Sequence, residues 1–184
     1  MTTDRTVSPE DVLTFWRNAG EARWWAKDEA FDNEIRTRFM RVWTDAAAGK
    51  LNTWLGSDDG MLALVIVLDQ FPRNMFRNDP RAFSTDGLAC KVAHEALTKG
   101  VDTRLSHDLR PFLYMPLMHS ETLADQERCV TLFEQLGNAE NVKFAIIHAD
   151  IIRKFGRFPH RNDVLGRITS DDEQAFLDSG GFSG

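Results

Sequence analysis

Apolar residues recur three and four positions apart along most of the chain, which is the spacing of helices that bury one face. The clearest example is the segment 28–49, in which Phe31, Ile35, Phe39 and Val42 fall on one helical face. We therefore expect a chain built from helices. Similar spacing predicts further helices over residues 8–16, 86–100, 121–137 and 141–156, and a terminal helix from residue 170.

Capping residues mark where these helices begin and end. Ser8 stands where an N-cap is expected, with Pro9 at the first helical position. Ser170 and Glu173 have the three-residue separation of a capping box. Glycine adopts the left-handed conformation of a helix C-terminus without strain, so four glycines predict helix ends. They are Gly49, Gly100, Gly137 and Gly156.

The segment Met61–Leu68 is apolar on every side. Its three consecutive β-branched residues would suit a buried strand, but the sequence offers no second strand to pair with it. We predict a central helix over Met61–Asp69 instead. Pro72 is expected to end it, because proline lacks the N–H group that a helix interior needs.

These elements predict an all-α fold of antiparallel helical hairpins, arranged as a bundle or as a short tetratricopeptide-like solenoid. The sequence does not contain the repeated pattern, about 34 residues long, of tetratricopeptide arrays. A length of 184 residues fits one folded core, and no linker-like stretch interrupts the chain. We therefore expect a single helical domain over residues 1–184.

The charge balance argues against nucleic acid as a partner. A formal net charge of -6 does not provide the broad cationic face that displaces counterions from phosphates. The segment 153–167 is the exception, because it holds five Lys or Arg residues and one Asp, a local balance of +4. If the protein binds an anion, we expect it to bind there.

Composition and the chain start bear on where the protein resides. With 42% hydrophobic residues the composition is that of a soluble globular protein, and the longest apolar run, eight residues, is shorter than the roughly 20 that span a membrane. The polar N-terminal residues lack a signal-peptide core, which predicts a cytoplasmic location.

Cys90 and Cys129 are too few for a disulfide framework, and both are expected to be small buried hydrophobic residues.

Three segments carry more polar side chains than a turn needs: Leu68–Arg77, Arg110–Glu121 and Arg153–Arg167. The first and third contain related strings, Phe71–Asn74 and Phe158–Asn162. In both, an aromatic residue and a proline direct the chain, and an arginine and an asparagine follow. Those two side chains would capture a carboxylate or phosphate, or would satisfy the last carbonyl groups of a helix.

The strings "DQFPRN", "PLMHSE", "DQER", "FGRFPHRN" and "LGR" occur in this order. Together they resemble a bacterial family catalogued as domain of unknown function number 924. The resemblance covers nearly the whole chain from Phe15 onward, and Trp25 and Met118 are the positions that depart from it. It implies an all-helical fold similar to tetratricopeptide-repeat proteins, and it implies no established activity.

Our first hypothesis for function is an Arg- and His-lined pocket that binds an anionic small molecule or peptide. A helical solenoid offers a groove, and guanidinium groups bind carboxylates and phosphates through two parallel hydrogen bonds. The residues predicted to bind the ligand are Asp69, Arg73, Asn74, Arg77, Arg157, Arg161 and Asn162.

Two alternatives remain open. The first is an uncharacterised enzyme whose catalytic candidates are His119, Glu121 and His160, since such groups exchange protons near neutral pH. The second is a structural network in a helical interaction module, in which Arg73 and Arg161 pair with carboxylates.

No His or Glu spacing typical of a metal-binding helix is present, so we predict no metal and no cofactor. The sequence leaves the oligomeric state open.

Overall fold

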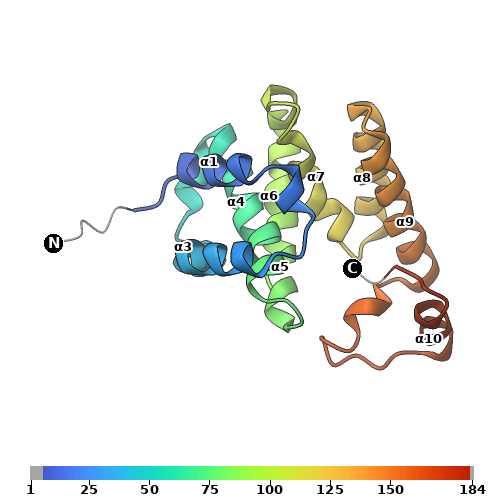
Figure 1. Cartoon of the computed structure of the whole chain (residues 1–184). Coiled ribbons are helices and arrows are strands. Elements are labelled where there is room, and N and C mark those ends of the chain that lie inside the picture. Colours follow the sequence, from blue (N-terminus) through green and yellow to red (C-terminus); the bar gives the residue numbers. More distant parts are fainter. Residues whose placement is uncertain (1–5, 183–184) are drawn as a thin grey trace. The chain divides into compact units, whose positions relative to one another are not determined.

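The structure, a computed structural model, describes residues 6–182 of the chain. No strand occurs among these residues, and the predicted all-α fold is confirmed (Figure 1). The chain divides into two compact units. Unit 1 comprises Met1–Arg77 and Arg81–Leu113, and unit 2 comprises Asn78–Pro80 and Tyr114–Gly184. The expectation of a single domain over residues 1–184 stays a prediction, as does the likeness to tetratricopeptide repeats.

Each unit has its own set of helices, and the helix α7 (Arg110–His119) carries the chain from unit 1 into unit 2. The helices of unit 1 are α1 (Pro9–Ala19), α2 (Glu21–Trp24), α3 (Glu29–Ala47), α4 (Asp58–Val65), α5 (Phe71–Met75) and α6 (Asp86–Thr98). Those of unit 2 are α8 (Leu123–Leu136), α9 (Ala139–Phe155) and α10 (Asp171–Asp178). Single turns of 3-10 helix occupy Asn52–Gly56, Pro80–Phe83, Val101–Arg104 and Pro159–Arg161.

The helix boundaries agree with the capping signals of the sequence. Ser8 caps α1 and exchanges hydrogen bonds with Asp11 in a capping box. Ser170 and Glu173 form the second capping box, at the start of α10. The predicted glycine stop at the end of α9 is confirmed, because Gly156 has a φ of 69° and its N–H bonds a carbonyl of the last turn.

The helix through the apolar segment does not end at Pro72. α4 passes into a π-helical turn, Ile66–Gln70, at whose end the Phe71 N–H bonds the Ile66 carbonyl five residues back. α5 then continues the chain through Pro72. The prediction of a stop is wrong because Pro72 lies in the first turn of α5, where a helix tolerates a missing N–H group.

α7 is not among the predicted helices. Every residue from Pro111 to Met118 is buried, so the segment has no polar face from which a helical period could be recognised. It also contains Pro116 in its interior, a position at which proline removes one backbone hydrogen bond. Because α7 is buried on all sides, its sequence lacks the helical alternation of apolar and polar residues.

The core of unit 1 is aromatic. Trp16, Phe31, Phe39, Phe71 and Phe112 are each at most 1% exposed. The ring centroids of Phe39 and Phe71 are 4.8 Å apart, and those of Trp16 and Phe112 are 5.4 Å apart at nearly right angles. Since each buried ring removes about 150–250 Å² from water, these side chains supply much of the apolar burial that holds α1, α3 and α5 together.

Unit 2 contains the antiparallel hairpin of α8 and α9, which lie side by side (Figure 1). Beyond the hairpin, Ile151, Ile152 and Phe158 form a small buried cluster, and Phe155 and Phe176 pack against it. This cluster holds the segment after α9 in place, and that segment carries most of the predicted site residues of unit 2. No described helix is long and apolar enough to cross a membrane.

Candidate functional site

In unit 1, Arg73 joins α5 to the start of α6. Its Nη1 and Nη2 donate to the two carboxylate oxygens of Asp86 at 2.8 and 2.9 Å. Nη1 also donates to the carbonyl of Asp69 at 2.7 Å and lies 3.3 Å from its carboxylate, which is fully buried in the π-helical turn. Burial alone would lower the pKa of Arg73, but the charges of both carboxylates outweigh it and raise the pKa, so the guanidinium stays charged.

Asn74 and Arg77 both bond Asp32, a buried carboxylate on α3. The Asn74 amide donates to Asp32 Oδ1 at 2.8 Å, and Arg77 donates from Nε and Nη2 to the two oxygens at 2.5 and 2.9 Å. This two-point contact ties α3 to the end of α5. The prediction that these residues, together with Asp69 and Arg73, bind a ligand stays a prediction.

In unit 2, Glu121 receives donors from two parts of the segment that follows α9. Arg167 donates to both of its carboxylate oxygens at 2.9 to 3.1 Å, and the Phe158 N–H donates to Oε1 at 2.8 Å. Burial acts to raise the pKa of Glu121, but these hydrogen bonds and the charges of Arg167 and Arg161 lower it below its usual range. The carboxylate is therefore ionised and already engaged.

Glu173 collects donors in the same way. Arg157 donates from Nε and Nη2 to its two oxygens at 2.6 and 2.7 Å, and the Ser170 N–H donates to Oε2 at 2.8 Å. The Asn162 amide adds a longer bond of 3.3 Å. The Arg157 hydrogen bonds are the largest cause that lowers the pKa of Glu173 to about 2, and they outweigh the opposing effect of burial. Arg157 and Asn162 thus brace the start of α10.

Two of the remaining predicted residues of unit 2, His160 and Arg161, lie beside Phe158. Arg161 is 6% exposed, its guanidinium carbon lies 4.4 Å above the Phe158 ring, and its Nη2 donates to the His119 carbonyl at 3.1 Å. The ring of His160 is 5.6 Å from that of Phe158. The ring of His148, on α9, lies 5.5 Å from Phe158 and 6.4 Å from His119. We call His119, His148, His160 and Arg161 the histidine cluster.

His148 is the member that the sequence analysis did not propose. Its Nδ1 lies 2.7 Å from the carbonyl of Phe144, one turn earlier on α9. Burial and the positive charge of His119, Arg161 and His160 together lower the pKa of His148 to about 3. The available signal was its position on the buried face of α9, between Ala145 and Ile152 in sequence, where a titratable side chain is unusual.

The predicted site residues therefore fall into two groups. His119, Glu121, Arg157, His160, Arg161 and Asn162 belong to unit 2, and Asp69, Arg73, Asn74 and Arg77 belong to unit 1. Within unit 2, the cluster brings His119, His160 and Arg161 together, while Arg157 and Asn162 meet at Glu173 instead.

Comparison with known proteins identifies the family. A family model described as bacterial protein of unknown function (DUF924) matches residues 12–181. The chain belongs to this family. A solved structure of a protein of unknown function from Agrobacterium tumefaciens is 42% identical in sequence, with a TM-score of 0.90 over 94% of this chain and 97% of that chain. No curated protein matches the chain. The resemblance seen in the sequence is confirmed, and the DUF924 description names no activity.

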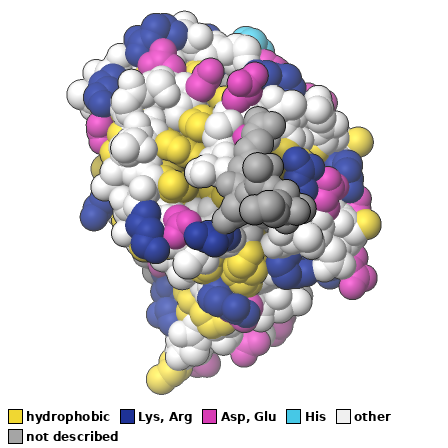
Figure 2. All heavy atoms as spheres, turned by 90° about the vertical axis from the view of Figure 1, so that its left-hand side faces the viewer, with side chains coloured by type: hydrophobic (Ala, Val, Ile, Leu, Met, Phe, Trp, Pro, Cys, Tyr) yellow, Lys and Arg dark blue, Asp and Glu magenta, His cyan; other side chains and the backbone are white. Residues whose placement is uncertain are grey.

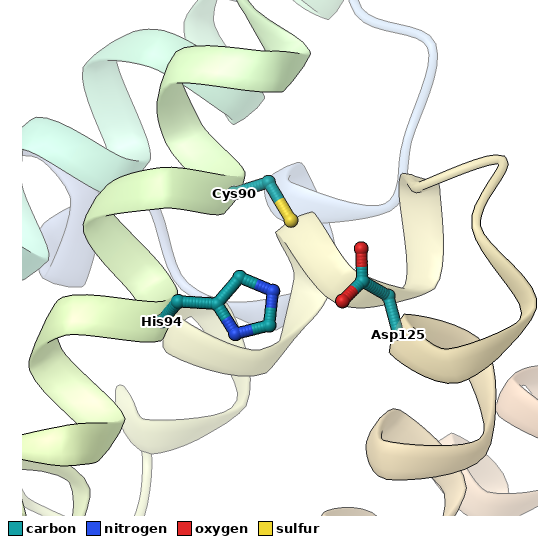
Figure 3. Close-up of side chains that lie close together, drawn as sticks. All are labelled: Cys90, His94 and Asp125. Carbon is teal, nitrogen blue, oxygen red and sulfur yellow. The ribbon is translucent and has the colours of Figure 1, made fainter.

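This DUF924 member also carries two ligand-type side chains on α6 of unit 1. Cys90 and His94 are one helical turn apart and project from the same face (Figure 3). Cys90 is half-buried, unlike the buried residue predicted, whereas Cys129 is buried as predicted. Figure 3 also draws Asp125, on α8 of unit 2, whose Oδ2 accepts the Ser120 hydroxyl at 2.7 Å. The Cys-x-x-x-His spacing of this pair is visible in the sequence and differs from the His and Glu spacings considered above.

Charges of both signs share the surface. On the face drawn in Figure 2, Lys and Arg side chains are interspersed with Asp and Glu, and hydrophobic side chains show between them. A groove of about 450 Å³ between α1 and α3 of unit 1 repeats this mixture. In this groove the guanidinium carbon of Arg23 lies 4.3 Å from the centre of the Phe31 ring, and that of Arg38 lies 4.6 Å from the centre of the Phe15 ring. Both arginines also form ion pairs with Glu34. None of the predicted site residues lines this groove.

Proposed function

We propose that unit 2 binds an anionic group, a carboxylate or a phosphate, at the histidine cluster. One observation carries the proposal: burial and the positive charge of the other cluster members lower the pKa of His148 to about 3. A low imidazole pKa reports that the surroundings disfavour a further positive charge. Burial opposes a charge of either sign, but the positive charge of His119, Arg161 and His160 would attract a bound anion.

The chemistry of the cluster suits a carboxylate or a phosphate. The guanidinium of Arg161 is planar and presents parallel N–H donors that match two oxygens of either group. Its burial removes competing water, which strengthens an ionic hydrogen bond. Glu121 contributes negative charge nearby, but its oxygens already accept bonds from Arg167 and from the Phe158 N–H. A bound anion would add negative charge to that of Glu121 and so balance more of the positive charge of the cluster.

The aromatic side chains beside the cluster bear on the kind of ligand. The rings of Phe158 and Phe182 lie 5.5 and 4.5 Å from that of His148, and of the two only Phe182 is partly exposed. Such surfaces favour an organic anion with an apolar part over a fully hydrated inorganic ion. We propose a small organic acid, a phosphoester or an acidic peptide as the ligand class.

In unit 1, one observation favours the structural alternative. Arg73 and Arg77 each bond two oxygens of one carboxylate, on Asp86 and Asp32 respectively. A guanidinium engaged in this way must give up a charged partner before it binds another, and breaking a buried pair typically costs about 3–5 kcal/mol. We propose that these arginines brace α3, α5 and α6, and that the anion site of unit 2 does not depend on them.

The His148 imidazole provides a direct test of anion binding. We would follow its carbon-bound proton by NMR during a pH titration, with and without phosphate, citrate or phosphoserine. Binding at the cluster is expected to move the pKa of His148 upward from about 3 toward its ordinary value, because the anion offsets the positive charge around it. An unchanged His148 titration at saturating concentrations of all three anions would reject the proposal.

Variants of Arg161 and Arg153 separate binding from folding. Arg161→Gln is expected to abolish the anion-dependent shift, and Arg161→Lys keeps a charge if the glutamine variant does not fold. Arg153→Gln is the matched control, because Arg153 is 52% exposed and pairs at the surface of unit 2 with Asp150. Loss of the shift in the Arg153 variant as well would indicate a general charge effect and would contradict a site at the cluster.

A further inference from the structure

One face of α6 carries a thiol and an imidazole close together. Asp86, Cys90, His94 and Thr98 follow one another at four-residue intervals along this helix. The Thr98 hydroxyl donates to the His94 carbonyl at 2.8 Å, one turn further along the helix. The Cys90 sulfur and a ring nitrogen of His94 lie within 4.8 Å of each other (Figure 3).

A separation of at most 4.8 Å is compatible with ligation of one metal ion. In a tetrahedral zinc site, Zn–S and Zn–N bonds of about 2.3 and 2.0 Å place the sulfur and the nitrogen roughly 3.6 Å apart. Rotation about the side-chain bonds of Cys90 and His94 would bring the two atoms to this separation. Ligands four residues apart on one helix face point to the same side, which is how the paired histidines of helical zinc motifs bind their metal.

The donor set also selects the kind of metal. A thiolate and an imidazole favour Zn²⁺ and similar borderline ions, whereas Mg²⁺ and Ca²⁺ prefer oxygen ligands. The nearest carboxylates of α6 itself are engaged elsewhere. Asp86 bonds Arg73 through both oxygens, and Glu95 accepts a bond from Lys99 at 2.7 Å. The helix therefore offers one sulfur and one nitrogen, and no oxygen ligand of its own.

We propose that Cys90 and His94 form a helix-borne ligand pair for Zn²⁺. The pair fills two of four tetrahedral positions, and the other two are open to water or to donors from a bound molecule. On binding, the Cys90 thiol releases one proton to solvent and the sulfur coordinates as thiolate, while His94 coordinates as neutral imidazole. The ligand pair shares no residue with the histidine cluster, so its test does not involve the anion site.

Cobalt substitution tests the pair, because Co²⁺ reports thiolate ligation by charge-transfer absorption in the near ultraviolet. We expect the full-length protein to bind one Co²⁺ with this absorption and Zn²⁺ to displace it. Cys90→Ser should abolish the band, and His94→Gln should lower the affinity for Zn²⁺ at least about tenfold. His107→Gln is the matched control, because His107 is an exposed loop histidine of unit 1.

A second measurement needs no variant. Zn²⁺ should slow the alkylation of Cys90 by iodoacetamide in the wild-type protein, as read by mass spectrometry of the peptide. Cys129 serves as the internal reference, because burial raises the pKa of its thiol and keeps it unreactive with or without metal. An absent cobalt band, a band that survives in Cys90→Ser, or alkylation of Cys90 unaffected by Zn²⁺ would each overturn the proposal.

Discussion

The segments Phe71–Asn74 and Phe158–Asn162 share an aromatic-proline beginning and an arginine-asparagine end, yet their arginines meet different neighbours. In unit 1, Arg73 bonds both oxygens of Asp86. In unit 2, Arg161 lies over the ring that opens its segment and donates to a backbone carbonyl. The role of a guanidinium thus depends on which groups the fold brings to it.

The backbone explains why similar strings diverge. Phe71 continues a helical path out of the π-helical turn, so its arginine points along α5 toward the start of α6. Phe158 instead follows the glycine end of α9 in an extended conformation, with a φ of -90° and a ψ of 109°. The 3-10 turn Pro159–Arg161 then folds the arginine back over Phe158. Arg73 therefore links two helices because its segment continues a helix, whereas Arg161 folds back on its own segment because that segment follows a helix end.

The largest expected effect comes from breaking the brace of unit 1. Asp32→Ala leaves the Arg77 guanidinium and the Asn74 amide without their acceptor. We expect the free energy of unfolding to fall by about 3 kcal/mol, the lower end of the range for buried pairs, because Arg77 is 33% exposed. Chemical denaturation measures the change.

A partly exposed carboxylate of the same helix is the control for that variant. Asp45, on α3, pairs with the exposed Lys50 at 3.1 Å. Asp45→Ala should therefore cost less than about 1 kcal/mol. Equal losses for the two aspartates would show that the contact with Arg77 is no more than a surface ion pair.

A smaller effect is expected from acid acting on the cluster of unit 2. Below pH 6.5 the unfolded chain protonates His148, whereas the folded chain keeps it neutral down to about pH 3. The unfolded state thus binds more protons, and the free energy of unfolding should fall by about 2 kcal/mol between pH 6.5 and pH 5. His148→Gln should flatten this slope, and His107→Gln should not. A bound anion should flatten it too, because it raises the pKa of His148.

The smallest effects should be the same in both units. Ser8→Ala and Ser170→Ala each remove a capping box and should each lower the free energy of unfolding by about 1 kcal/mol. Thr122→Ala is the control, because Thr122 occupies the N-cap of α8 without a side-chain hydrogen bond. If Thr122→Ala lowered the free energy of unfolding as much as the two serine variants do, loss of capping would not be the cause. Thermal melting of the three variants makes the comparison.

Local signals in the sequence predicted much of the fold and less of the candidate site. The capping boxes and the glycine ends act within one or two helical turns, so residue spacing reveals them. The partners of the arginines are distant in sequence. Arg77 and Asp32 are 45 residues apart, and Arg167 and Glu121 are 46 apart. Because its partner Glu121 is so distant in sequence, Arg167 was not among the predicted binding residues, although the positive charge of the segment 153–167 is evident from the sequence.

By itself, the sequence determined that this DUF924 member is helical, where most of its helices begin and end, and that its positive charge gathers after α9. Only the tertiary structure decided which carboxylate each arginine meets and that His148 joins the histidine cluster. The physical reason is one of range. Helical period and capping depend on neighbours within a few residues, whereas ion pairs form where helices pack, and that packing is set by aromatic side chains buried together from distant parts of the chain.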